Sequence, residues 1–203
     1  MSFIHPSSII EDGAIIGQNV SIGPFCYIAS CVTVGNGCTL VSHVSLGGKP
    51  QSSEPPNPLG RVVIGANTTM NEFVTVHRPC KQFTKVGNDC LLMSAAHVAH
   101  DCIVGNHVTI TSISGISGYC EIGDYTVISG GCHVHQYSKI GRYCMLGAGT
   151  YIKGDSPDGI VWIGDKKPAK PLKVNEIGLQ RNMPSDIEEI RIAAERFINA
   201  TDN

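Results

Sequence analysis

An aliphatic residue recurs at every sixth position along most of this 203-residue sequence. The series covers residues 4 to 46, resumes over 64 to 76, and then runs unbroken from 86 to 152. Each of the 23 hexads begins with Ile, Leu, Val or Met. Repeats of this kind are typical of solenoids, in which each unit buries its apolar face by stacking on its neighbours. The repeat therefore predicts a coiled, repetitive chain.

A small residue lies two positions before many of these aliphatic residues. Residues two apart on a strand face the same side, so both positions point into one interior. Most of the nine cysteines, such as Cys26, Cys90 and Cys144, share this slot, whereas Cys31 does not. We therefore interpret the cysteines as compact buried hydrophobes and not as metal ligands or disulfides.

Glycine follows the aliphatic residue in many hexads and recurs every 18 residues from Gly87 to Gly141. We expect these glycines to turn the chain at corners that need positive φ. Three short strands and three corners then close one triangular coil. The predicted fold is all-β, a parallel β-helix of hexapeptide repeats that occupies residues 1–164.

Two segments depart from the repeat. Residues 47–61 are rich in Pro, Ser and Gly, which predicts an excursion loop. Residues 165–203 form a C-terminal extension with one amphipathic helix at about 185–200. Ser185 and Glu188 have capping-box spacing. The apolar face of this short helix is expected to comprise Ile187, Ile190, Ala194, Phe197 and Ile198.

Charge and hydropathy exclude several classes of function. The net charge of −2 does not favour a nucleic-acid partner. The first residues have neither the basic nor the apolar region of a secretory signal. No apolar run approaches the roughly 18 residues of a membrane span. We expect a soluble cytoplasmic protein without a membrane span.

The 18-residue coil brings polar residues far apart in sequence onto one edge. His100, Gly118 and Gln136 should stack on successive coils, with His135 in the neighbouring column. A histidine base beside an exposed glycine amide suits acyl transfer, which needs proton removal and N–H donors at the oxyanion. Asp101 can orient the His100 imidazole only if a corner falls between the two residues.

Other interpretations of the histidines remain open. His77 and His135 occupy the slot that glycine often fills, so tolerance of positive φ could explain both. His100 could be a solvated surface residue. We expect no metal site, because no two histidines are five apart as in γ-class carbonic anhydrases. A zinc site from another grouping across a subunit boundary stays open.

The segments GNDCLLMSAAHVAHDCIVGN, ISGGCHVHQY and VNEIGLQR resemble the UDP-N-acetylglucosamine O-acyltransferase family of lipid A synthesis. The resemblance covers residues 3–48 and 61–182. It implies a left-handed β-helix and a homotrimer with active sites between subunits. His100 would be the general base, Asp101 its orienting partner and Gly118 the oxyanion donor. The residues implied in substrate binding are His77, His97, Tyr119, His135, Gln136, Asn175 and Arg181.

The implied reaction transfers an acyl chain, expected to be 3-hydroxyacyl, from acyl carrier protein to the 3-hydroxyl of UDP-N-acetylglucosamine. No bound cofactor is implied. Lys166, Lys167, Lys170 and Lys173 form a basic cluster that suits an acidic carrier protein. Tyr119 and the 47–61 loop differ from the family pattern. Two alternatives therefore stay open: transfer to another nucleotide-linked amino sugar, with acetyl-CoA as a donor, and a non-catalytic trimeric paralogue.

Overall fold

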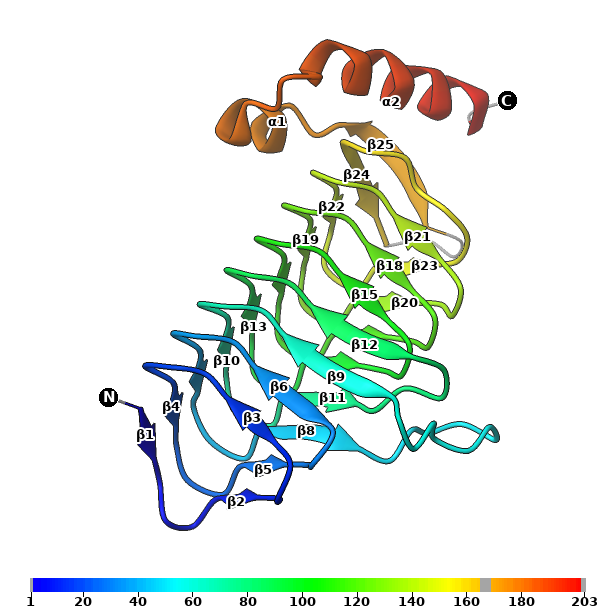
Figure 1. Cartoon of the computed structure of the whole chain (residues 1–203). Helices are drawn as coiled ribbons and strands as arrows, with labels where there is room; N and C mark the ends of the chain where they lie inside the picture. The colour runs from blue at the N-terminus through cyan, green and yellow to red at the C-terminus, as the bar shows by residue number, and fades with distance from the viewer. Residues whose placement is uncertain (1, 165–168, 202–203) are drawn as a thin grey trace.

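The hexads fold into short strands that stack in three parallel sheets, as Figure 1 shows. The computed structural model describes residues 2–164 and 169–201. Strands 18 residues apart in the regular part of the repeat pair with each other; Thr109, for example, pairs with Val127. The predicted parallel β-helix and its coil length are therefore confirmed. One antiparallel pair, β24 with β25, ends the first sheet.

The strands of each sheet come from successive coils. Sheet A contains β1 (Phe3–Ile4), β4 (Ser21–Ile22), β7 (Thr39–Leu40), β10 (Thr69–Met70), β13 (Leu91–Leu92), β16 (Thr109–Ile110), β19 (Val127–Ile128), β22 (Met145–Leu146), β24 (Ile160–Ile163) and β25 (Lys170–Val174). Sheet B contains β2 (Ile9–Ile10), β5 (Tyr27–Ile28), β8 (Ser45–Gly48), β11 (Thr75–His77), β14 (His97–Val98), β17 (Gly115–Ile116), β20 (His133–Val134) and β23 (Tyr151–Ile152). Sheet C contains β3 (Ile15–Ile16), β6 (Val32–Val34), β9 (Arg61–Ile64), β12 (Phe83–Val86), β15 (Ile103–Val104), β18 (Glu121–Ile122) and β21 (Lys139–Ile140).

The aliphatic residues and the small residues before them fill the interior of the coils. Ile110, Ile116 and Ile128 are fully buried, and most of the cysteines lie in the same core. All nine cysteines are free thiols, and only Cys31 is partly exposed. Burial raises the pKa of the Cys144 thiol to about 11. The cysteines of the hexads pack as hydrophobic side chains, which agrees with the interpretation from the sequence, whereas Cys80 lies outside this core.

The glycines that recur every 18 residues from Gly87 to Gly141, and Gly65 before them, do not have the positive φ that we expected; among the glycines that follow an aliphatic residue of the repeat, Gly47 does, with a φ of 80°. A Cβ built on Gly65 would lie 2.4 Å from the carbonyl carbon of Gly87, and one on Gly87 would lie 2.3 Å from the carbonyl oxygen of Gly105. The reason for glycine is therefore the close approach of successive coils. Positive φ falls two residues later, as at Asn67 and Asp89.

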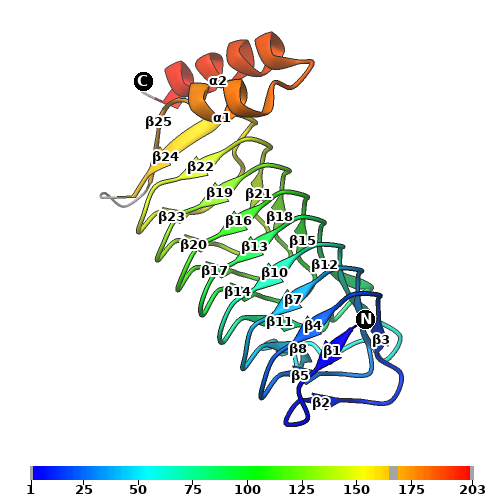
Figure 2. The ribbon, with the colours of Figure 1, turned by 90° about the vertical axis from the view of Figure 1, so that its left-hand side faces the viewer.

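The C-terminal segment contains two helices where the sequence predicted one. Figure 2 shows α1 (Glu176–Asn182) and α2 (Ile187–Thr201) at the C-terminal end of the coils. Ile190 and Ala194 of α2 are buried, which confirms its apolar face. The capping box is not formed; the Ile187 amide donates to the Pro184 carbonyl instead.

The basic cluster in the C-terminal extension is only partly described. Lys166 and Lys167 lie outside the described residues, whereas Lys170 and Lys173 belong to β25. Within the described ranges, neither helix is long and apolar enough to cross a lipid bilayer.

The excursion loop leaves the coils between β8 and β9, where the cyan trace of Figure 1 projects outward. It returns against the insertion between β11 and β12. The Lys81 ammonium lies 2.6 Å from a Glu54 carboxylate oxygen, and Asn57 donates to the Lys81 carbonyl. These contacts hold the loop beside the next corner of the β-helix.

Candidate active site

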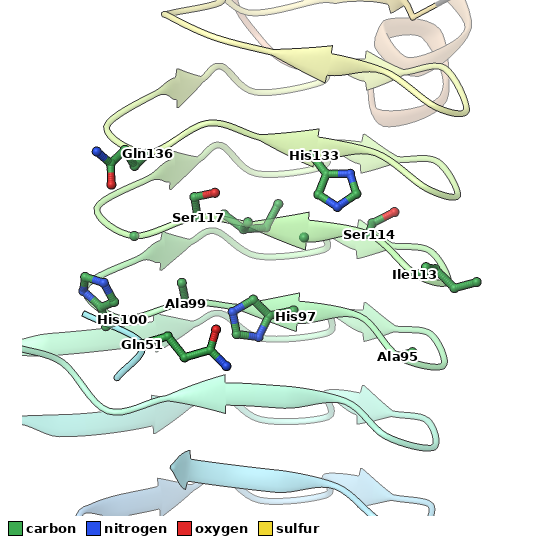
Figure 3. Close-up of a pocket in the computed structure, with 13 residues that line it drawn as sticks. Gln51, Ala95, His97, Ala99, His100, Ile113, Ser114, Ser117, His133 and Gln136 are labelled. Carbon is green, nitrogen blue, oxygen red and sulfur yellow. The ribbon is translucent and has the colours of Figure 1, made fainter. Parts of the chain in front are cut away.

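Two glycines of one coil open a pocket in the side of the β-helix. Gly115 lies between His97 and His133 on adjacent strands of sheet B. Gly118 lies at the corner that follows, one coil beyond His100. The resulting cavity of about 450 Å³ is shown in Figure 3 and is lined by Gln51, Ala95, His97, Ala99, His100, Ile113, Ser114, Gly115, Ile116, Ser117, Gly118, His133 and Gln136.

His100 and Asp101 form a hydrogen-bonded pair at the edge of this pocket. Asp101 has a left-handed φ of 59°, so the corner does fall at this residue. The turn brings Asp101 Oδ2 to 2.9 Å from His100 Nδ1, although the two residues are neighbours in sequence. An ionised carboxylate only accepts hydrogen bonds, so Nδ1 carries the imidazole proton. The other ring nitrogen, Nε2, is then free to accept a proton.

The Asp101 carboxylate is held by the insertion between β11 and β12. The Cys80 amide donates to Oδ2 at 2.9 Å and the Lys81 amide donates to Oδ1 at 2.7 Å. The Asp101 amide in turn donates to Thr84 Oγ1 at 2.8 Å. Both carboxylate oxygens have fixed donors, so Asp101 can hold the His100 ring in one orientation.

Tyr119 packs against the His100 ring and ties it to the excursion loop. The two rings meet edge to face with centroids 5.1 Å apart. The Tyr119 hydroxyl donates to Glu54 Oε2 at 3.1 Å. Burial and the bond to Glu54 raise the pKa of Tyr119, while Lys81 and then Tyr119 lower the pKa of Glu54. Tyr119 therefore stays a neutral donor, and Glu54 stays ionised next to the pocket.

Gly118 approaches His100 so closely that no side chain fits between them. An ideal Cβ on Gly118 would lie 2.7 Å from His100 Cε1 and 2.8 Å from Nε2. Among the described residues, no acceptor takes a hydrogen bond from the Gly118 amide, whereas the next amide, of Tyr119, donates to the His100 carbonyl. The Gly118 N–H is therefore available to a ligand next to the free nitrogen of His100.

His97 lines the pocket in its neutral form, and His77 packs behind it. His97 Nδ1 lies 2.7 Å from Thr75 Oγ1, and the two imidazole rings meet edge to face at 4.7 Å. Burial, followed by the charges of His77 and His100, lowers the pKa of His97 to about 4. Burial also lowers the pKa of His77, whose Nδ1 is buried with no hydrogen-bond partner in the described part of the chain.

The depressed pKa of His97 predicts a loss of stability in acid. Between pH 6.5 and about 4 the unfolded chain binds a proton that folded His97 does not bind. Above pH 6.5 His97 is neutral in both the folded and the unfolded chain, so the free energy of unfolding has its full value there. It falls as the pH drops through this window, by up to about 1.4 kcal/mol per pH unit. Urea unfolding from pH 7.5 to 4 checks this, with His97→Asn expected to flatten the dependence. Equal slopes for both proteins would contradict it.

The remaining residues that the sequence singled out lie outside this pocket. His135 bonds through Nδ1 to the Gln136 carbonyl and packs against Tyr151. Asn175 caps α1 and donates to the Tyr143 carbonyl. Asn175 and Arg181 line a separate hollow of about 470 Å³ between α1 and sheet A. Neither His77 nor His135 has positive φ, so that interpretation of both residues is wrong.

His133 and Gln51 are among the pocket residues that sequence reasoning missed. His133 lies 36 residues, or two coils, after His97, with Gly115 between them, and this 18-residue spacing could have identified it. Gln51 comes from the excursion loop, and Figure 3 places its side chain beside His97, Ala99 and His100. No repeat relates Gln51 to the site, because the loop lies outside the hexads.

A coiled hexapeptide repeat with a histidine–aspartate pair and an open glycine amide defines a hexapeptide-repeat acyltransferase. The family model described as "Bacterial transferase hexapeptide (six repeats)" matches residues 13–48 and 119–154. LpxA from Acinetobacter baumannii is 32% identical over 94% of this chain and 82% of that chain, with a TM-score of 0.80. LpxA from Bacteroides fragilis is 31% identical over 94% and 83%, with a TM-score of 0.82.

UDP-N-acetylglucosamine O-acyltransferase (LpxA) from Moraxella catarrhalis is 30% identical over 94% of this chain and 82% of that chain, with a TM-score of 0.79. The chain belongs to the UDP-N-acetylglucosamine O-acyltransferase family, and it is an acyltransferase with the left-handed β-helix that the resemblance implied.

Proposed function

We propose that this acyltransferase moves a 3-hydroxyacyl chain from acyl carrier protein to the 3-hydroxyl of UDP-N-acetylglucosamine, a step of lipid A synthesis in the cytoplasm. The observation that carries this proposal is the His100–Asp101 pair facing the Gly118 amide in one pocket. The printed names of the related structures supply the acceptor, since they are acyltransferases of UDP-N-acetylglucosamine.

The geometry supports a mechanism of general base catalysis. His100 Nε2 takes the proton from the sugar hydroxyl, whose oxygen attacks the thioester carbonyl carbon. The carbon–sulfur bond then breaks, and the leaving thiolate takes the proton back from His100. Asp101 stabilises the imidazolium between these steps, and the Gly118 N–H donates to the oxyanion. These groups move every proton, so the mechanism requires no bound cofactor and no metal.

We propose a homotrimer in which a neighbouring subunit completes the site, and the surface beside the pocket supports a subunit interface there. Exposed Phe25 and Phe73 stack on either side of His43 along the corner between sheets A and B. The same column continues to Ile113, which is 70% exposed at the rim of the pocket. An apolar ridge of this kind is commonly covered by another protein surface. We propose that a neighbouring subunit covers it.

A subunit in that position could supply the missing contacts to substrate. In this proposal His77 supports His97 from behind, and His135 keeps Gln136 at the pocket edge. Asn175 and Arg181 would then reach the nucleotide or donor arm bound by the neighbouring copy. Tyr119 would act next to the acceptor sugar through its contact with His100.

One observation favours a second acceptor. The Glu54 carboxylate bonds to Tyr119 and remains about half exposed beside the catalytic pair. Its Oε2 is already paired with the Lys81 ammonium, but no described residue donates to its Oε1, which can therefore accept a hydrogen bond from the amino group of a substrate. A nucleotide-linked amino sugar, acylated on nitrogen from carrier protein or acetyl-CoA, is therefore the alternative substrate.

A turnover assay with mass spectrometry tests both candidates. Purified protein is incubated with 3-hydroxyacyl carrier protein and UDP-N-acetylglucosamine, and in parallel with acetyl-CoA or with a 3-amino analogue of the acceptor. We expect an acylated UDP-N-acetylglucosamine that gains one hydroxyacyl mass. Product from the amino sugar alone would reject the leading acceptor, and absence of product from every pair would reject catalysis.

A further inference from the structure

Cys80 places a buried thiol beside the catalytic pair. Its sulfur, a ring nitrogen of His100 and a carboxylate oxygen of Asp101 all lie within 4.8 Å of one another. Cys80 and His100 are 8% and 7% exposed, and the Asp101 side chain is 5% exposed. Cys80 belongs to the insertion before β12 and lies outside the hexads, so the packing role of the other buried cysteines does not explain it.

The three groups make a ligand set that suits zinc. Thiolate, imidazole and carboxylate are the usual zinc ligands, and three protein ligands leave a fourth position for water. His100 and Asp101 are neighbours at one corner of the β-helix, and the amides of Cys80 and Lys81 donate to the Asp101 carboxylate, so hydrogen bonds hold the segment that carries Cys80 against this corner. The thiol donates to the Glu54 carbonyl at 3.5 Å, a weak contact that a metal bond can replace.

We propose that Cys80, His100 and Asp101 form a zinc site whose occupation switches the acyltransferase off. Zinc binds the Cys80 sulfur, from which the thiol proton leaves to solvent. It also binds His100 Nδ1, and the proton of that nitrogen moves through solvent to Nε2. Nε2 then carries hydrogen and cannot accept the proton of the acceptor hydroxyl. The inhibitory part of this inference rests on the proposed role of His100 as base.

The arrangement of the pair explains why zinc would compete with catalysis and not assist it. His100 Nδ1 faces Asp101, and His100 Nε2 faces Gly118 and the pocket. A metal held between His100 and Asp101 occupies the nitrogen that faces away from substrate. It would therefore change the tautomer of the base without reaching the reacting carbonyl.

Cobalt and zinc titrations of the full-length protein test the site. Cobalt(II) reports thiolate ligation through a charge-transfer absorption band, which does not depend on activity. We expect this band in the wild type and in Cys31→Ala, and its loss in Cys80→Ala. Cys31 is the matched control, because it is the partly exposed thiol and would show any adventitious binding. A band that survives Cys80→Ala would overturn the site.

To measure inhibition, the rate of each protein with added zinc is divided by the rate of the same protein in the presence of a chelator. Wild type and Cys31→Ala should lose activity with zinc and regain it with chelator. Cys80→Ala should need at least about 10-fold more zinc for the same degree of inhibition. Loss of a residue that only hydrogen-bonds to a metal ligand already lowers metal affinity by about this factor. If the wild type transfers acyl groups normally and zinc does not inhibit it, the zinc inference is overturned but the proposed function is not. A cobalt band in a protein without transferase activity would support the site and reject the proposed function.

Discussion

Replacing His100 with alanine is expected to lower the rate of acyl transfer by about 10²–10⁴-fold and to leave the β-helix folded. The imidazole supplies the nitrogen that removes the proton from the acceptor hydroxyl, and among the histidines that line the pocket His100 is the one bonded to a carboxylate. His97 is turned toward Thr75 through Nδ1. His133 lies two coils from His97, across Gly115. Steady-state rates with saturating donor and acceptor measure the loss.

The control is a histidine far from the pocket. His5 lies near the N-terminus, where its Nδ1 is 2.8 Å from Ser7 Oγ, and His5→Ala should retain the wild-type rate. Circular dichroism establishes whether both variants keep the β structure. A folded His100→Ala protein that works within tenfold of the wild type would show that His100 is not the base.

Much of the fold could be predicted from the sequence because the hexad is a strictly local signal. Each aliphatic residue must face the interior, and three hexads must close one coil, so residues 18 apart become neighbours. The same arithmetic predicts that Gly118 lies beside His100, which the structure confirms. It also brings His133 into the pocket, where it was overlooked although the spacing was visible.

The role of the glycines was misjudged because the two reasons for glycine look alike in a sequence. A glycine can be required by positive φ or by a neighbour that leaves no room for a side chain. In this β-helix the positive φ is taken by residues such as Tyr119 and Asp101. That assignment also decides whether Asp101 can turn back to His100, which the sequence left open.

The parts outside the repeat were the least predictable. The loop that carries Gln51 and Glu54 has no period, so its return to the catalytic corner follows only from tertiary contacts with Lys81 and Tyr119. The short helix α1 was missed as well. Asn175 caps that helix and donates a hydrogen bond to the Tyr143 carbonyl. No local sequence pattern predicts this tertiary contact.

Adding a single methyl group at Gly118 is expected to lower the rate of acyl transfer by about 10²-fold. The alanine Cβ would lie 2.7 Å from His100 Cε1, so the imidazole must move away from its position over the pocket. A displacement of the order of 1 Å at a catalytic group costs about this much in rate. Because φ at Gly118 is outside the left-handed region, the backbone itself accepts alanine, and the loss should appear in kcat without a loss of folding.

Gly130 provides the matched control for this variant. It occupies the same place in its hexad, two residues after Ile128, and its φ also lies outside the left-handed region. A Cβ there would meet its nearest neighbour, the Ser112 carbonyl oxygen, at an ordinary 3.6 Å. Gly130→Ala should therefore behave as wild type. If both alanine variants lose activity equally, the loss arises because the coils do not accept alanine at this position of the hexad, and the close approach of Gly118 to His100 is not the cause. If only Gly118→Ala loses activity, the empty volume above the imidazole is what the site requires.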